Sequence, residues 1–190
     1  MKKLLKAAVA VSLALSSSTV FAEKPNDDKP IFSSSTFKAM ELRNIGPAYM
    51  SGRIADIAID QNNPSTWYTA VGSGGVWKTT NAGNTWTPIF DKQAVYSIGD
   101  VTIAPSNSNI IWVGTGENNG GRHISFGDGV YKSVDGGQTW NNVGLEKSEH
   151  ISDIIIHPTN PDIVWVSAQG PLWSGGGERG LYKTTDGGDT

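Results

Sequence analysis

Residues Gly129–Trp140 read GVYKSVDGGQTW, and the chain holds this pattern three times. Gly75–Trp86 reads GVWKTTNAGNTW, and Gly180–Thr190 reads GLYKTTDGGDT. Self-similarity of this kind is the signature of a repeat architecture, so it has to be interpreted before any single residue.

A second pattern precedes each copy and gives the length of the repeat. It is an Asp that opens a short apolar run, followed by Pro and then Trp, and it begins at Asp56, Asp100 and Asp153. Each unit holds four short runs of β-branched and aromatic residues separated by Gly, Asn and Pro, which is the composition of strands joined by turns. Four strands in roughly 45 to 50 residues make one β-propeller blade. The sequence therefore predicts an all-β fold with blades of four antiparallel strands at about 53–92, 98–143 and 151–190.

The polar residues of the repeated turn are expected to be structural. The Asp135 carboxylate can accept hydrogen bonds from the backbone of the turn, Gly137 can take a positive φ, and Trp140 can pack beneath the hairpin. Asn81 in the first unit keeps the acceptor and loses the charge. The residues assigned this structural role are Asn81, Gly83, Trp86, Asp135, Gly137, Trp140, Asp186 and Gly188.

The N-terminus has the pattern of a removable export signal, residues 1–22. Lys2, Lys3 and Lys6 precede an apolar run that is too short to span a bilayer, and a small-residue cleavage site ends at Ala22. We therefore expect a periplasmic or secreted protein with no membrane insertion after signal removal. Residues 23–36 are expected to be a flexible lead-in and residues 37–190 the propeller segment.

Composition excludes several classes of function. The chain has 15 Lys and Arg against 18 Asp and Glu, a net charge of -3, and loss of the three signal lysines leaves 12 against 18, or -6. This acidic balance argues against nucleic acid as a partner. The chain has no Cys, which excludes disulfides, thiolate metal sites and a cysteine nucleophile. The three His residues lack carboxylates at ligand spacing, so no metal and no cofactor is predicted.

Several motifs resemble known families. The turn SVDGGQTW at 133–140 resembles the Asp-box of bacterial neuraminidase (BNR) repeats, a motif of β-hairpins inside propellers. A wider set resembles the sortilin N-terminal-like proteins of bacteria, which are often labelled glycosyl hydrolases: RNIGP at 43–47, SGRIADI at 51–57, GTGEN at 114–118 and ERGLYK at 178–183. The resemblance covers about residues 37–190 and only the front of such a protein.

Relatives of this repeat class imply opposite functions. Sortilin-type propellers bind peptides and proteins, whereas xyloglucanases cleave plant glucans with two Asp residues. In the stretch that resembles the first catalytic Asp, Ala70 stands in its place, and the second would lie beyond residue 190. The xyloglucanase mechanism is therefore not carried over. The Arg-Ile-Pro signature of sialidases is also absent, because Arg43 is followed by Asn-Ile-Gly. Similar propellers also resemble photosystem assembly proteins, which implies a third role in assembling an envelope complex.

Function is expected in the loops that differ between the units. Residues 116–129 and 169–180 form long insertions where the first unit has four residues, and long variable loops on a rigid frame are where binding concentrates. The candidate ligand-binding residues are Arg53, Glu117, Asn118, Asn119, Arg122, His123, Trp173, Glu178 and Arg179. An exposed Trp beside Arg and carboxylates can stack on a sugar ring or hold a peptide side chain. The alternative is a solvated loop whose Trp173 covers the blade edge.

Two further interpretations of these loops stay open. Glu117 and Glu178 are candidate catalytic residues, because glycoside cleavage needs two carboxylates. An oxygen-only Ca²⁺ site around Glu117, Asn118 and Asp128 is a second option, although no EF-hand-like loop supports it.

The repeated Asp that begins each unit is expected to cap backbone amides near the central channel. The residue three places earlier differs between units, as Arg53, Ser97 and His150. These three side chains are expected to line the mouth of the channel.

Propellers have four to eight blades, so three blades, the last without its Trp, would not close a ring. We therefore expect either the N-terminal piece of a larger propeller or several short chains in one ring. The functional hypothesis is an exported propeller that binds a peptide, protein or glycan through its loops. A glycoside hydrolase resembling the xyloglucanases and an assembly factor for an envelope complex are the alternatives.

Overall fold

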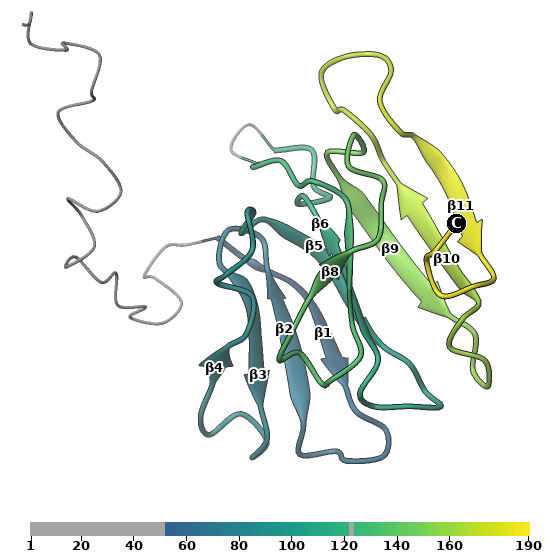
Figure 1. The fold of residues 1–190 in the computed structure, drawn as a ribbon. Coiled ribbons are helices and arrows are strands. Elements are labelled where there is room, and N and C mark those ends of the chain that lie inside the picture. The colour runs from purple at the N-terminus through teal and green to yellow at the C-terminus, as the bar shows by residue number, and fades with distance from the viewer. Residues whose placement is uncertain (1–51, 122–123) are drawn as a thin grey trace, which may run out of the picture. The chain divides into compact units, whose positions relative to one another are not determined.

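The computed structural model describes residues 52–121 and 124–190, which form three antiparallel sheets and contain no helix (Figure 1). No segment among these residues could cross a membrane as a helix. The expected export signal and lead-in lie outside the described residues.

Each sheet is one blade, and its strands lie in chain order. The first blade is β1 (Ile54–Ile59), β2 (Trp67–Val71), β3 (Gly75–Thr79) and β4 (Thr87–Pro88). The second blade is β5 (Ile98–Ile103), β6 (Ile111–Thr115), β7 (Val130–Ser133) and β8 (Asn141–Asn142). The third is β9 (Ile151–Ile156), β10 (Val164–Ala168) and β11 (Gly180–Thr184). The prediction of four-stranded antiparallel blades is confirmed for the first two blades, and the described part of the third blade has three antiparallel strands.

Alternating side chains of each strand build the core between blades. Because successive residues of a strand point to opposite faces, β2 directs Tyr68 and Ala70 toward the second blade, where they join one apolar cluster with Val101 and Val113. A second cluster lies between the second and third blades and includes Trp112 and Val166. The second blade is therefore covered on both faces.

The turn at 133–140 is held by the Asp135 carboxylate. Its Oδ1 accepts hydrogen bonds from the backbone N–H groups of Gln138 and Thr139, both at 2.9 Å, and its Oδ2 accepts one from the Thr139 hydroxyl at 2.5 Å. These donors lower the pKa of Asp135 to about 2, because they stabilise the charged form. Gly137 has a φ of 88°, a conformation that a side chain would strain.

Polar contacts also join neighbouring blades. Lys78 Nζ donates to the Gly136 carbonyl at 2.9 Å, and Lys132 Nζ repeats the contact with Gly187 at 2.8 Å. Near the axis, Asp56 Oδ2 accepts a hydrogen bond from the Val101 N–H at 3.3 Å. The predicted capping of backbone amides by the repeated Asp is confirmed at Asp56.

Candidate functional site

The two long loops lie at the same end of the blades. In the loop between β6 and β7, the Gly127 N–H donates to the Glu149 carbonyl at 2.8 Å. In the loop between β10 and β11, the Glu178 N–H donates to the Lys147 carbonyl at 3.3 Å. Both loops thus contact the same segment that enters the third blade. We call this end the loop face: residues 72–74, 116–121, 124–129 and 169–179 with the entry segments 52–53, 92–97 and 144–150.

The loop at 116–129 is held to the first and third blades. Arg53 Nη1 lies 2.9 Å from Glu117 Oε1, and their side chains are 41% and 7% exposed. On the other side, Asn118 Nδ2 donates to the Ser152 carbonyl at 3.1 Å. One loop therefore connects three blades, which fixes its backbone over the inner strands.

Within the second blade, Ser97 fixes the base of the same loop. Its hydroxyl accepts a hydrogen bond from the Glu117 N–H at 3.0 Å and donates to the Ser125 carbonyl at 2.8 Å. Gly72 leaves room for the Glu117 side chain, because a Cβ at position 72 would lie 2.5 Å from Glu117 Oε1. The ion pair therefore depends on a close approach that only glycine allows.

Two residues expected at the channel mouth are instead buried beneath this loop. Ser97 and His150 are both fully buried, and only Arg53 of the three equivalent positions is exposed. The prediction was wrong for Ser97 and His150 because the loop at 116–129 covers them. Burial lowers the pKa of His150, and the ring of Phe126 packs on it edge-on with centroids 5.8 Å apart.

The other predicted ligand-binding residues have different environments. Trp173 is 70% exposed, and Asn119 is also exposed. Glu178 Oε2 accepts the Lys147 N–H at 2.8 Å, and Arg179 donates to the Pro171 carbonyl. Arg122 and His123 lie outside the described residues.

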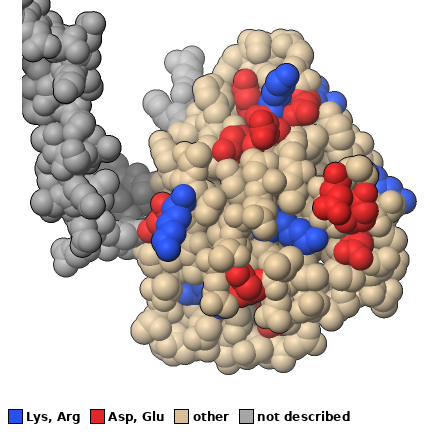
Figure 2. All heavy atoms as spheres, in the orientation of Figure 1, with Lys and Arg blue, Asp and Glu red and all other residues tan. Residues whose placement is uncertain are grey.

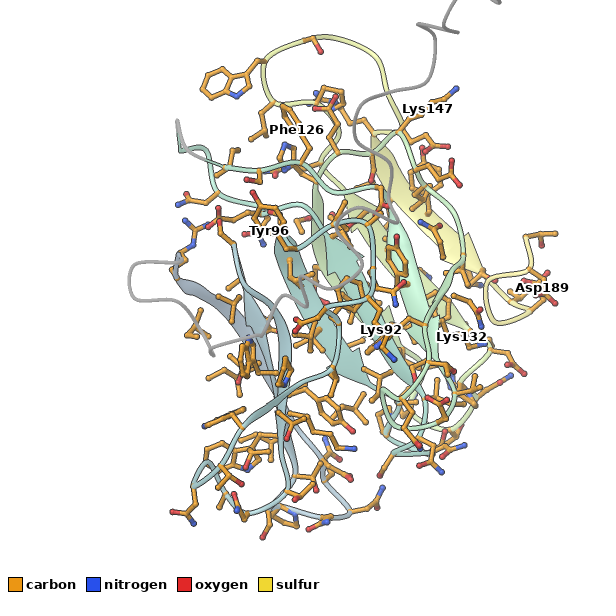
Figure 3. All side chains as sticks on the ribbon, turned by 60° about the vertical axis from the view of Figure 1, so that its left-hand side comes forward. Lys92, Tyr96, Phe126, Lys132, Lys147 and Asp189 are labelled. Carbon is orange, nitrogen blue, oxygen red and sulfur yellow. The ribbon has the colours of Figure 1, made fainter. Side chains whose placement is uncertain are left out.

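Two exposed aromatic residues were missed by the sequence reasoning. Tyr96 and Phe126 are each 58% exposed, and the Tyr96 hydroxyl lies 3.5 Å from Ser125 Oγ. Figure 3 shows both at the loop end of the blades, away from Lys132. The sequence could have indicated both residues, because Phe126 lies in a variable loop and Tyr96 lies in a segment that enters a blade. Together with Trp173 they give the loop face three aromatic side chains that are more than half exposed.

The candidate catalytic carboxylates already have protein partners. Glu117 pairs with Arg53, and Glu178 accepts a backbone N–H. Ala70, which replaces the catalytic Asp of xyloglucanases in the sequence comparison, is completely buried on β2. The arrangement suits the shaping of a surface better than the transfer of a proton.

The oxygen atoms considered for Ca²⁺ are also occupied by protein donors. Asp128 accepts hydrogen bonds from the Tyr131 hydroxyl at 2.8 Å and the Thr115 hydroxyl at 3.4 Å. Among residues 52–121 and 124–190, no group of three or more acidic, His or Cys side chains is arranged to hold a metal ion.

A polar cavity of about 340 Å³ follows the inner strands and is lined by all three repeated Asp residues. Burial, followed by the charges of Asp56 and Asp153, raises the pKa of Asp100 to about 8. Asp100 therefore holds a proton at neutral pH.

On the outer surface, Figure 2 shows acidic and basic groups in small clusters separated by uncharged residues.

Comparison with solved structures identifies β-propeller proteins. An ancestral GH74 enzyme is 23% identical with a TM-score of 0.59, over 74% of this chain and 18% of that one. The GH74 enzyme of Niastella koreensis is 26% identical with a TM-score of 0.50, over 70% and 19%. YCF48 from Cyanidioschyzon merolae is 18% identical with a TM-score of 0.50, over 74% and 36%.

These similarities show the fold of the chain, which is that of a β-propeller. The matched region spans about a fifth of the GH74 enzymes and between a third and two fifths of YCF48. No family model and no curated protein matches the sequence.

Proposed function

We propose that this chain belongs to an exported β-propeller that binds a peptide, protein or glycan through its loop face. The observation that carries the proposal is the group of three exposed aromatic side chains, Tyr96, Phe126 and Trp173. Exposed aromatic rings offer large apolar area at low entropic cost and stack on sugar rings or apolar side chains.

The loop face also supplies polar groups for orientation. Glu117 occupies only one edge of the Arg53 guanidinium, which is partly exposed and has five N–H donors in total. The ion pair keeps this guanidinium in one position, so little side-chain entropy is lost when a ligand accepts its remaining hydrogen bonds. Asn119 adds an exposed amide. Aromatic contact with a few fixed polar donors is the usual composition of a binding surface.

The structural neighbours are compatible with a binding propeller. One of them is YCF48 in a structure bound to D1 peptide, 16% identical with a TM-score of 0.50. Others are GH74 enzymes, one of which is a xyloglucanase from Xanthomonas campestris, 16% identical with the same TM-score. Both a peptide and a polysaccharide are therefore reasonable ligands to screen, and a role as an assembly factor is one form of protein binding.

The proposal is tested by screening the purified exported chain against arrays of peptides and of plant and bacterial glycans. Any ligand found is then titrated against Trp173→Ala and Phe126→Ala. We expect each substitution to weaken binding about 10-fold or more, since an aromatic contact at a binding site contributes about 1–2 kcal/mol.

Val134→Ala provides the matched control. Val134 is exposed to the same degree as Phe126, 58%, but lies in the turn at the opposite end of the second blade. Binding that weakens equally in Val134→Ala and Phe126→Ala would place the ligand away from the loop face. The absence of any ligand in both arrays would also contradict the proposal.

A glycoside hydrolase resembling the xyloglucanases is the second candidate, supported by the GH74 neighbours. Release of reducing ends from a glucan panel, lost in Glu117→Gln and in Glu178→Gln, would favour it. We expect no such release, because both carboxylates are engaged by protein donors.

A further inference from the structure

The polar cavity along the inner strands is a second candidate site. Its volume is about 340 Å³, and ligand pockets commonly measure about 300–1,000 Å³. All three described blades supply its lining, through residues 56–62, 100–105 and 153–154. None of these residues belongs to the loop face. A ligand bound in this cavity would therefore be independent of the function proposed for the loop face.

The lining of the cavity is acidic. Its charged residues are Asp56, Asp60, Asp100 and Asp153, and no Lys, Arg or His stands among the described residues that line it. Each of β1, β5 and β9 stands at the end of its described sheet, so one edge of the strand has backbone groups that are unpaired within that sheet. When ionised, the carboxyl groups add acceptors and no donors. The cavity therefore suits a ligand that carries positive charge and N–H donors.

Asp100 is the acidic residue of the cavity that lacks a partner. It is 8% exposed, and a backbone hydrogen bond with Ile154 reaches its carboxyl group. Its Oδ2 is buried and has no hydrogen-bond partner among the described residues. The charged groups nearest to it are Asp56 on β1 and Asp153 on β9, and both repel a negative charge on Asp100. A buried polar oxygen without a partner costs free energy, and a donor from a ligand would remove that cost.

The arrangement of the carboxyl groups selects the kind of cation. A metal ion needs several oxygen ligands within about 2.0–2.6 Å, and no three acidic side chains in the described part of the chain are arranged to provide them. An ammonium group attracts carboxylates across about 4–6 Å, and its three N–H donors can serve separate acceptors. A guanidinium group is planar and suits bidentate contact with one carboxylate. The carboxyl groups of Asp56, Asp100 and Asp153 come from three different strands, which favours the ammonium group.

We propose that this cavity binds a primary ammonium group, held by Asp56, Asp100 and Asp153. The group belongs to a free polyamine or to a lysine side chain of a peptide. The ammonium ion replaces the proton on Asp100, which passes to the solvent, so the total charge of the cavity is unchanged. Since the pKa of Asp100 is about 8 and that of an alkylammonium group is about 10, binding should strengthen at least 10-fold from about pH 6 to about pH 8.

Calorimetric titration of the purified chain tests the proposal without any substitution. Spermidine represents a free polyamine, and a Gly-Lys-Gly peptide with blocked ends represents a lysine side chain. Titration at about pH 7 in two buffers of different ionisation enthalpy measures the protons released, and we expect about one per amine bound, because Asp100 is mostly protonated at this pH. Amines held by exposed carboxylates would release none, since such groups are already ionised. The probe that binds with proton release identifies the source of the ammonium group.

Asp100→Asn removes the charge and keeps the shape of the carboxyl group. We expect amine binding at about pH 8 to weaken at least 10-fold and the proton release to disappear, because the ammonium group loses the carboxylate that it pairs with. Asp189→Asn, at an exposed position outside the cavity, is the matched control and should bind amines as the parent chain does. Circular dichroism shows whether each variant is folded.

Magnesium chloride and hexanediol are the control ligands. Mg²⁺ that binds as tightly as the amines would indicate a metal site, and hexanediol that does so would show that the cavity does not recognise charge. Either result would overturn the proposal. So would the absence of amine binding between about pH 6 and about pH 9, amine binding without proton release, or unchanged binding in a folded Asp100→Asn chain.

Discussion

Asp56 and Asp100 occupy the same position in successive blades but differ in their surroundings. Asp56 is half-buried and caps the Val101 N–H, whereas Asp100 is 8% exposed and lies between two other carboxylates. Burial and like charge both disfavour ionisation, so the pKa of Asp100 is raised to about 8. The repeat therefore determines where the carboxyl group lies, and the residues around that group determine its pKa.

Stability is therefore expected to fall as pH rises from about 4 to about 8. The pKa of Asp100 is raised to about 8 in the folded chain, above its usual 3.8, so the folded state keeps a proton that the unfolded state releases in this window. The stabilisation is complete below the unfolded pKa and is lost as pH passes the folded one. Thermal unfolding between pH 4 and pH 9 should show this slope, and Asp100→Asn should flatten it. Asp189→Asn, at an exposed position that does not line this cavity, is the control and should leave the slope in place.

At the scale of the element, the blades use a Trp after the turn as a wedge between sheets. Trp140 is buried among residues of the first and second blades, whereas Trp173 in the loop between β10 and β11 is exposed. Both residues are visible as Trp in the sequence. Trp140 is recognised as the core residue because it follows a turn that Asp135 stabilises, whereas Trp173 follows no such turn.

Trp140→Ala is expected to lower the free energy of unfolding by about 3–5 kcal/mol, because it removes a large buried ring and leaves a cavity. The substitution also removes the hydrogen bond to the Ile89 carbonyl. Urea denaturation followed by circular dichroism measures the change. Trp173→Ala is the matched control and should alter stability by less than about 0.5 kcal/mol. Similar losses in the two variants would contradict the assignment of Trp140 to the core.

At the scale of the whole molecule, burial is uneven across the described blades. β6 is buried along its full length and β5 over most of it, because blades cover both faces. β1 has no fully buried residue, and β11 is largely exposed. Local stability follows burial, so the second blade is expected to be the most stable of the three described blades.

Amide hydrogen exchange is expected to show this gradient. Amides of β5 and β6 should exchange at least 10-fold more slowly than those of β1 and β11, because β5 and β6 are the more buried strands. Uniform exchange across the three blades would contradict the burial pattern.

The sequence by itself determined the blades, the turn chemistry and the side on which both long loops lie. These features depend on local patterns: a period of two along strands, an acceptor at Asp135, and glycine at a positive φ. The tertiary structure alone decided which loop residues are available. His150 is covered by a loop from another blade, Arg53 meets Glu117 across a blade boundary, and Phe126 stays exposed. Such contacts join residues far apart in the chain, and no local period encodes them.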